Sequence, residues 1–318
     1  MIQQIAEIIK KGRTFLVTSH MRLDGDAVGS ELALYEALRG LGKEVVVYNQ
    51  DRTPQMYAFL PDAGVIVNRL GPVEGFDAVF VLDCSEMERT GEEAPRIAGI
   101  RQIINIDHHI SNDRYGNLTL TDPEASSTGE MIFRLVDGMR LEITRDMAIN
   151  LYTAILTDTG AFRYSNTGPK TFAVAGRLLE KGADPAWIAQ MVYETFPAVK
   201  IRLLGRALLT LEFDWQGRIA AITVSKRMLD EAGAQWEHTE GFVEFPRAIE
   251  GVQVAVFFSE IAEGLYKVSL RSKGRFNVEE VAHRFGGGGH INAAACRIQG
   301  DGDTVKRKLF DAIKNGGR

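Results

Sequence analysis

Residues 14–30 read TFLVTSHMRLDGDAVGS, and this stretch decides the fold class that we expect. Residues 14–19 form an apolar run with the length and composition of a buried strand. Polar residues follow at once, and residues 26–39 then repeat apolar side chains at helical spacing until Gly40 ends the pattern. A strand that leads through a polar loop into a helix is typical of a βαβ unit, so we predict an α/β fold with a parallel sheet.

The same arrangement recurs along the first half of the chain. Apolar runs predict further strands at 44–48, 78–82 and 102–106. Helices are predicted to about residue 136 from an N-cap at Ser126 or Ser127, over 145–156 from an N-cap at Thr144, and over 170–181. Strands that alternate with helices in this way pair in parallel and are joined by right-handed crossovers.

Acidic and imidazole groups follow the apolar runs. His20, Asp24 and Asp26 come after the first run, Asp83 after 78–82, Asp107-His108-His109 after 102–106, and Asp158 after 154–157. Ligands of open α/β sheets bind at the carboxyl ends of the strands. We therefore place all four clusters at strand ends, on one edge of the sheet.

The composition is that of a globular protein with room for two domains. The chain has 318 residues, of which 45% are hydrophobic and 25% charged, and its formal net charge is −5. That charge argues against broad affinity for long nucleic acids but leaves room for a local basic cleft. Cys84 and Cys296 lie far apart and form no CxxC pair, which favours a reduced, cytoplasmic compartment. We find no signal-peptide pattern and no apolar run of the ~20 residues that span a bilayer, so we expect no membrane attachment.

A change of pattern divides the chain. Strands are predicted at 218–224, 252–259 and 265–271, and helices at 278–285 and 305–315, without regular alternation. We assign residues 1–181 to a metal-binding catalytic domain with a parallel sheet and residues 205–318 to a smaller mixed α/β domain. Residues 182–204 are interpreted as a helical linker. We expect the active site in the cleft between the domains.

The clusters of the first domain contain the donor groups of a metal centre. They supply four carboxylates and two imidazoles, from His20, Asp24, Asp26, Asp83, His108 and Asp158. Several carboxylates cannot share one pocket fully ionised without cations. Two divalent cations about 3.5–4 Å apart would balance four carboxylates, and one carboxylate can bridge them. Oxygen and imidazole donors without thiolate favour Mn²⁺, with Mg²⁺, Co²⁺, Fe²⁺ and Zn²⁺ as alternatives.

Each cluster taken alone has a simpler explanation. An aspartate after a strand is usually a helix cap or a turn residue, and Asp26 would also cap the helix that follows it. A pair such as His108-His109 more often lies exposed on the surface than serves as a set of metal ligands. Four clusters in the same position relative to a predicted strand are hard to explain as independent caps, so we favour the metal centre.

Four segments resemble the motifs of the DHH phosphoesterase superfamily. They are SHMRLDGDAVGS at 19–30, LDCS at 82–85, DHH at 107–109 and TDTG at 157–160, and their order and spacing match the family across residues 14–165. Leu23 stands where the family often has proline, a change that removes no ligand.

This resemblance implies a role for each residue of the clusters. One Mn²⁺ is held by His20, Asp24 and Asp83. The other is held by Asp26, Asp83, His108 and Asp158, so that Asp83 bridges the two. His109 faces the phosphate, and Asp107 orients the cluster from behind the ligands, a support that such sites need.

The second domain resembles the DHHA1 substrate-binding domain. The segments that carry this resemblance are SLRSKG at 269–274 and FGGGGH at 285–290. It implies that the non-scissile part of the substrate is held by Arg271, Ser272, Gly287, Gly288, Gly289 and His290. Glycines allow backbone N–H groups to approach an anion, and an arginine can bind a phosphate through two hydrogen bonds. By local sequence alone, a turn beside a basic strand end explains these residues equally well.

Together the two domains are similar to the branch of oligoribonucleases and pAp phosphatases called nanoRNase. The resemblance implies hydrolysis of short single-stranded RNA, linear dinucleotides and 3′-phosphoadenosine 5′-phosphate (pAp), by water that two cations activate. Three alternatives are a cyclic-dinucleotide or dinucleotide-specific phosphodiesterase, a non-catalytic nucleotide-binding protein, and an inorganic pyrophosphatase. The glycine run counts against the pyrophosphatase. The sequence leaves the oligomeric state open, a homodimer included.

Overall fold

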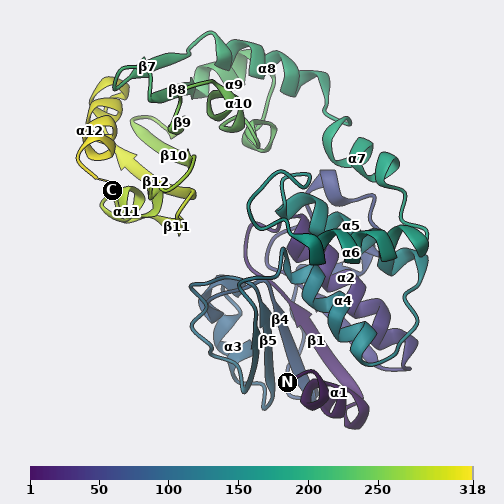
Figure 1. Ribbon diagram of the computed structural model, residues 1–318. Helices are drawn as coiled ribbons and strands as arrows, with labels where there is room; N and C mark the ends of the chain where they lie inside the picture. The colour runs from purple at the N-terminus through teal and green to yellow at the C-terminus, as the bar shows by residue number, and fades with distance from the viewer. Residues whose placement is uncertain (317–318) are drawn as a thin grey trace. The chain divides into compact units, whose positions relative to one another are not determined.

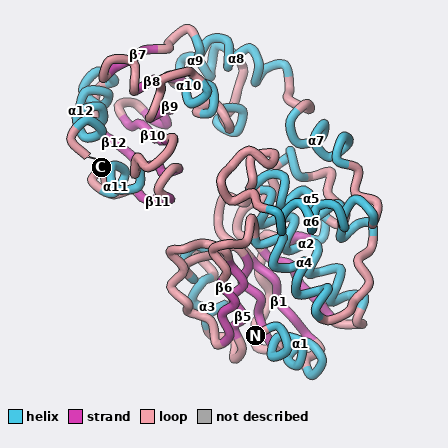
Figure 2. Tube along the Cα trace, viewed as in Figure 1, coloured by secondary structure: helices cyan, strands magenta, loops and turns pink. Residues whose placement is uncertain are grey.

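Two six-stranded sheets organise the chain (Figures 1 and 2). The structure, a computed structural model, describes residues 1–316 apart from the side chain of His290. The chain divides into the units Met1–Thr195 and Phe196–Arg318, and the division falls within the segment interpreted as a linker.

The sheet of the first unit is parallel throughout, as predicted. Its strands lie in the order β3-β2-β1-β4-β5-β6. Their bounds are β1 Thr14–Thr18, β2 Glu44–Tyr48, β3 Ile66–Val67, β4 Ala78–Leu82, β5 Ile103–Asp107 and β6 Leu118–Thr121. From β1 the sheet is extended by β2 on one side and by β4 on the other. The strand order therefore reverses beside β1, and this is where open α/β sheets bind their ligands.

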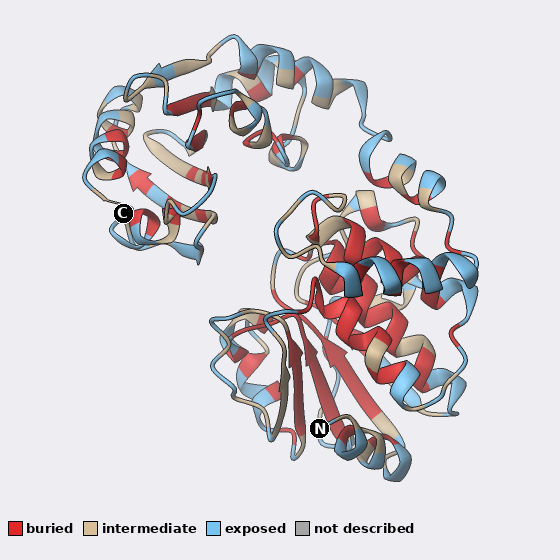
Figure 3. Cartoon of the chain, in the orientation of Figure 1, coloured by how far each residue is buried: buried red, intermediate tan, exposed pale blue. Residues whose placement is uncertain are grey.

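Helices cover both faces of this sheet. One face packs against α2 (Gly25–Gly40), α4 (Thr128–Gly138) and α5 (Arg145–Asp158), and the other against the short α3 (Ala94–Ala98). Figure 3 shows that the central strands β1, β4 and β5 and much of α2 and α5 are buried. A Cβ atom on Gly29 would lie 2.4 Å from the carbonyl oxygen of Asn150, so the absence of a side chain there lets α2 approach α5 closely. The first unit also contains α1 (Ile2–Lys11), α6 (Pro169–Glu180) and α7 (Pro185–Tyr193).

Two sequence-based expectations in this unit are wrong. Asp158 is the last residue of helix α5 and follows no strand. The run 154–157 is the end of the helix that is predicted over 145–156 and confirmed as α5, because a short apolar run is also typical of a buried helix end. The N-cap of α2 is Asp24, whose Oδ1 accepts a hydrogen bond from Ala27 N at 3.0 Å, and not Asp26.

The second unit has a mixed sheet, as predicted. Its order is β11-β12-β10-β9-β8-β7, and only β8 and β9 pair in parallel among the described strands. The strands are β7 Glu212–Asp214, β8 Ile219–Val224, β9 Val254–Ala262, β10 Leu265–Ser272, β11 Gly288–His290 and β12 Ala293–Gln299.

Helices pack on both faces of the mixed sheet as well. One core lies beneath α11 (Val278–His283) and α12 (Gly302–Lys314). The other lies beneath α8 (Ala198–Leu208) and α9 (Lys226–Ala232), against β8 and β9, and includes Val243, which directly precedes α10 (Glu244–Ala248). Single 3₁₀ turns complete the two units, at Gln55–Tyr57, Ala63–Val65, Met87–Thr90 and Trp236–Thr239. Within residues 1–316, none of the helices combines the length and the apolar character that crossing a bilayer requires.

Candidate metal centre

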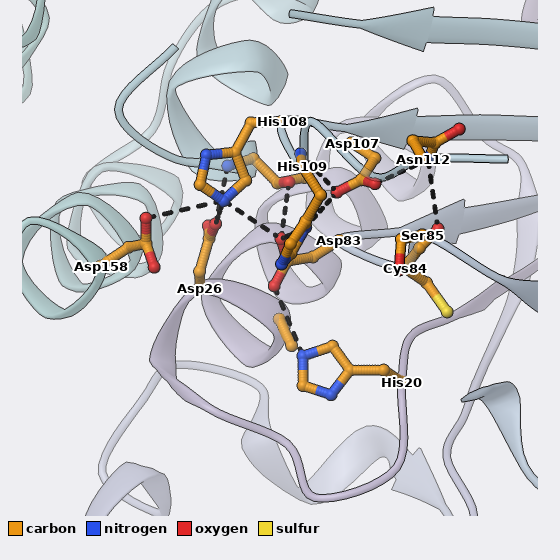
Figure 4. Close-up of polar contacts among 12 residues, drawn as sticks. His20, Asp26, Asp83, Cys84, Ser85, Asp107, His108, His109, Asn112 and Asp158 are labelled. Carbon is orange, nitrogen blue, oxygen red and sulfur yellow. Dashed lines mark hydrogen bonds and ion pairs between the residues drawn. The ribbon is translucent and has the colours of Figure 1, made fainter. Parts of the chain in front are cut away.

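The six predicted donor residues meet at the carboxyl end of the parallel sheet. Figure 4 labels all of them except Asp24. His20 follows β1, Asp83 follows β4, and His108 follows β5. Asp24 and Asp26 lie at the start of α2, and Asp158 lies at the end of α5. Three strand ends and two helix ends therefore bring together residues that are separated by up to 138 positions in the sequence.

The first ligand group consists of His20, Asp24 and Asp83. His20 Nε2 lies 3.4 Å from Asp83 Oδ2 and 3.8 Å from Asp24 Oδ2. The other ring nitrogen, Nδ1, lies 2.8 Å from the carbonyl oxygen of Met21. Because a carbonyl only accepts hydrogen bonds, Nδ1 carries the proton, and Nε2 is the nitrogen that can ligate a cation.

The second group consists of Asp26, His108 and Asp158. His108 Nε2 lies 3.6 Å from Asp158 Oδ2 and 3.8 Å from Asp26 Oδ2. It also lies 3.6 Å from Asp83 Oδ1, the second oxygen of the carboxylate that faces His20. The two oxygens of Asp83 thus face one group each, which is the geometry that a bridging carboxylate requires.

The cluster carries more negative charge than its buried position favours. Burial and the neighbouring charges of Asp83, Asp158 and Asp24 raise the pKa of Asp26 well above its ordinary value. Burial raises the pKa of Asp158, an effect that His108 opposes and Asp83 reinforces. Divalent cations would relieve this repulsion, so the donor set fits them chemically.

The pKa values of His20 and Asp83 shift in the opposite sense, toward the charged forms of both groups. Burial lowers the pKa of His20, but the hydrogen bond to Asp83 and the charges of Asp24 and Asp83 outweigh it and raise that pKa to about 9. Burial alone would raise the pKa of Asp83, but the hydrogen bond from His20 and the charges of His109 and His108 hold it well below its usual range. Asp83 is therefore the carboxylate of the cluster that ionises most readily.

The N-terminus of α4 holds two of the carboxylates in place. Asp26 accepts hydrogen bonds from the backbone N–H of Thr128 at 2.7 Å and of Gly129 at 2.8 Å, and from Ser30 Oγ at 3.0 Å. Thr128 Oγ1 donates to Asp83 at 3.0 Å. Unpaired N–H groups at a helix N-terminus favour negative charge, which explains how a fully buried carboxylate is tolerated there. Thr128 was not singled out in the sequence, although the N-cap predicted at Ser127 places it in the first turn of α4.

Asp107 and His109 form a separate pair beside the two groups. Asp107 Oδ1 accepts a hydrogen bond from His109 Nδ1 at 2.6 Å, and Asp107 is fully buried. Burial lowers the pKa of His109, but the hydrogen bond to Asp107 and the charges of Asp83 and Asp107 raise it to about 9. The ring of His109 is thus oriented by Asp107, while its Nδ1 still lies 3.6 Å from Asp83 Oδ1.

The sequence reasoning missed a polar network behind this pair. Asn112 Nδ2 donates to Asp107 Oδ2 at 2.6 Å and to Asn105 Oδ1 at 2.8 Å. Asn105 and Tyr115 both hydrogen-bond the carbonyl oxygen of Cys84, at 3.1 and 2.9 Å. The sequence does contain one indication of this network. Asn105 is a polar residue inside the apolar strand β5, and a buried amide needs hydrogen-bond partners.

The predicted substrate residues of the second unit lie at one end of its sheet. The glycine run is partly a strand, since Gly288–His290 forms β11 and pairs with β12. Gly286 has a φ of +69°. A Cβ atom on Gly287 would lie 2.2 Å from Ala295 O, whereas one on Gly288 would meet nothing within 4 Å. Packing therefore explains the glycine at position 287 but not the one at 288.

The side chains near this strand have structural partners. Arg271 Nε donates to Glu244 Oε1 at 3.2 Å, and its Nη1 donates to the carbonyl oxygen of Leu270 at 3.0 Å. Ser272 is buried, and its hydroxyl donates to Phe276 O at 2.6 Å. Arg271 and His290 are both partners of Ala293 in the strand register, so the backbones of these two residues flank one position of β12. The side chain of His290 lies outside the described residues.

Comparisons with known proteins agree with this architecture. Residues 14–155 match the DHH family, N-terminal domain, and residues 216–315 match the DHHA1 domain. The chain therefore belongs to the DHH/DHHA1 family of phosphoesterases, as the resemblance of the motifs predicted.

Individual relatives extend over nearly the whole chain. It is 35% identical, over 98% of its length and 92% of the relative's, to the bifunctional oligoribonuclease and PAP phosphatase NrnA of Thermus thermophilus. It is 28% identical to the NrnA of Bacillus subtilis, over 94% of this chain and 93% of the relative. The crystal structure of an exopolyphosphatase-related protein from Bacteroides fragilis superposes with a TM-score of 0.95 at 29% identity, covering 99% of this chain and 95% of that one.

Proposed function

We propose that this protein is a metal-dependent phosphoesterase that hydrolyses short oligoribonucleotides, linear dinucleotides and pAp. The observation that carries the proposal is the position of Asp83, whose two oxygens face His20 and His108 from opposite sides. The relatives named bifunctional oligoribonuclease and PAP phosphatase, similar over almost the full chain, support this choice of substrates.

In this proposal His20, Asp24 and Asp83 hold one divalent cation, and Asp26, Asp83, His108 and Asp158 hold the other. When bound, two such cations supply an activated water and neutralise charge on the phosphoryl oxygens. Mn²⁺ is the cation that we propose, because imidazole and carboxylate donors without thiolate suit it, and Mg²⁺ and Co²⁺ are the alternatives.

The chain's own groups position the phosphate. His109, oriented by Asp107, donates a hydrogen bond to a phosphoryl oxygen and stabilises the charge that develops there. Although burial lowers the pKa of His109, the hydrogen bond to Asp107 and the charges of Asp83 and Asp107 raise it, which favours the protonated imidazole that attracts an anion more strongly. The helix N-terminus at Thr128 holds the carboxylates Asp26 and Asp83 so that their oxygens keep their places during the reaction.

The second unit is proposed to bind the part of the substrate that is not cleaved. Arg271, the backbone of Gly287–Gly289 and His290 are the groups that contact it. Gly288 supports this assignment, because it is exposed and no packing contact explains its missing side chain. Ser272 contributes by holding the turn after β10 through Phe276 and Asn292, whose Nδ2 donates to its hydroxyl at 2.8 Å.

Three further assignments are part of the proposal. The domain bounds are 1–181 and 205–318 with a helical linker at 182–204. The location is cytoplasmic, which agrees with the unpaired thiols of Cys84 and Cys296. The third is a homodimer, which light scattering of the purified protein would test.

A substrate panel tests the function. Initial rates would be measured with Mn²⁺ on pAp, pGpG, pApA, a five-residue RNA, a 24-residue RNA, a cyclic dinucleotide and pyrophosphate. We expect turnover of pAp and of the short linear RNAs, and much slower turnover of the 24-mer. Cleavage of the cyclic dinucleotide or of pyrophosphate alone would reassign the substrate class, and no turnover of any compound would contradict an enzymatic role.

A further inference from the structure

We propose that Asn112 is a positioning residue that acts on catalysis through Asp107 and His109. This inference rests on the proposed function, which places His109 at the phosphate. It assigns a task to a residue that is not a ligand and that lies five positions beyond Asp107 in the loop after β5.

The contacts form a continuous path from Asn112 to the imidazole (Figure 4). Asp107 Oδ1 takes the hydrogen bond from His109 Nδ1 at 2.6 Å and a second one from His109 N at 3.2 Å. Its other oxygen, Oδ2, accepts from Asn112 Nδ2 at 2.6 Å. Donors therefore hold both oxygens of Asp107, which fixes the rotation of the carboxylate about its χ2 angle.

Asn112 is itself held on three sides. Its Nδ2 also donates to Asn105 Oδ1 at 2.8 Å, and its Oδ1 accepts from the backbone N–H of Arg114 at 2.7 Å. Asn105 in turn donates to Val81 O and Cys84 O, each at 3.1 Å. Since Nδ2 of Asn112 faces three oxygen acceptors, on Asp107, on Asn105 and, at 3.4 Å, on the backbone of Cys84, the amide has one orientation that satisfies them.

The path therefore links the backbone at the end of β4 to the imidazole of His109. Asp83 leaves β4 at that same end, so one backbone segment sets the positions of both Asp83 and Asp107. Without the amide of Asn112, Asp107 Oδ2 would lose its hydrogen-bond donor, and the carboxylate could rotate away from His109 Nδ1. Partners behind the ligands typically account for about 10- to 100-fold in activity, and we expect a loss of kcat in that range.

The test compares Asn112→Ala, Asn112→Asp, His109→Ala and the double variant Asn112→Ala/His109→Ala. Asn112→Asp keeps the side-chain volume and replaces the amide donor with a second carboxyl group beside Asp107, so it serves if the alanine variant does not fold. Asn117→Ala is the matched control, because Asn117 Oδ1 accepts from Ile103 N at 2.7 Å at the opposite end of β5. Each protein would be assayed on pAp with Mn²⁺ for kcat, KM and bound cation, after a thermal melt has checked its folding.

We expect Asn112→Ala and Asn112→Asp to lower kcat about 10- to 100-fold, with KM and cation content unchanged. We expect the double variant to be no slower than His109→Ala alone, because both changes remove the same contribution. Wild-type kcat in the Asn112 variants, a loss of cation, or losses that multiply in the double variant would overturn the inference. A wild-type protein that hydrolyses nothing would instead overturn the proposed function.

Discussion

The carboxylate of Asp83 lies 3.4 Å from His20 Nε2, and both residues are buried at the end of the parallel sheet. The other oxygen of the same carboxylate lies 3.6 Å from His108 Nε2. Asp83 also has a φ of +51°, a left-handed backbone that is uncommon outside glycine. Such conformations cluster at functional sites, where the surrounding structure enforces them.

The first prediction concerns this shared carboxylate. Asp83→Asn removes one negative charge and one ligand oxygen from both groups at once, with little change of shape. We expect a loss of kcat/KM on the order of 10³-fold or more, comparable with removal of a major electrostatic stabiliser. Steady-state kinetics and metal analysis would be compared with Asp137→Asn, a surface carboxylate that pairs with Arg177. Near-normal turnover with normal cation content would contradict the bridging role.

The second prediction separates the adjacent histidines. His108 Nε2 faces three carboxylates, whereas His109 Nδ1 is bonded to Asp107. We expect His108→Ala to lower the amount of bound Mn²⁺, and His109→Ala to retain the cation and to lower kcat. Metal analysis together with steady-state kinetics tests this division of roles. An equal loss of bound cation in both variants would contradict it.

The structure explains which parts of the site the sequence could predict. Asp83 and His108 follow strands whose buried, β-branched runs are plain in the sequence, so their meeting at one sheet edge could be predicted. Asp158 reaches the same place from the end of α5, which the helix predicted over 145–156 indicates and the apolar run 154–157 taken alone does not. Asn112 was not found, because its contacts depend on how the loop after β5 folds back onto Cys84.

The third prediction concerns substrate binding by the second unit. Arg271→Ala and His290→Ala should raise KM, or lower kcat/KM, for pAp and dinucleotides, since each lost charged hydrogen bond costs about 1.5–3 kcal/mol, roughly 10- to 100-fold. Hydrolysis of bis-p-nitrophenyl phosphate should change far less, because that ester lacks the part of the substrate that they bind. Arg206→Ala serves as control, since Arg206 pairs with Glu231 on the surface. If both variants handle every substrate as the wild type does, these residues only support the fold.

The fourth prediction concerns Glu31, which is fully buried beneath the centre and accepts a hydrogen bond from Asn49 Nδ2 at 2.7 Å. Within the described part of the chain its Oε1 has no partner, and burial raises its pKa from 4.5 to about 8. Below the lower value Glu31 is protonated in both the folded and the unfolded states. Between the two values the unfolded state releases the proton and the folded state keeps it, so the free energy of unfolding falls as the pH rises.

Glu31→Gln removes this titration while keeping the side-chain shape. We expect the stability of the variant relative to the wild type to grow between pH 4.5 and about 8, by at most about 1.4 kcal/mol per pH unit. Urea unfolding of chelator-treated protein across this range measures the difference, with the exposed Glu74→Gln as control. A difference that does not change with pH would show that Glu31 has the same charge in both states.

The most direct measurement for the two-cation centre is the recovery of activity as Mn²⁺ is added back to chelator-stripped protein. Bound Mn²⁺ per chain and the rate of pAp hydrolysis would be followed together, for the wild type and for Asp83→Asn. We predict no activity in the stripped wild type, full activity at two bound ions per chain, and weakened binding of both ions in the variant. Full activity without any bound cation would contradict the central claim. So would full activity of the wild type at one bound ion per chain, if Asp83→Asn still binds that ion.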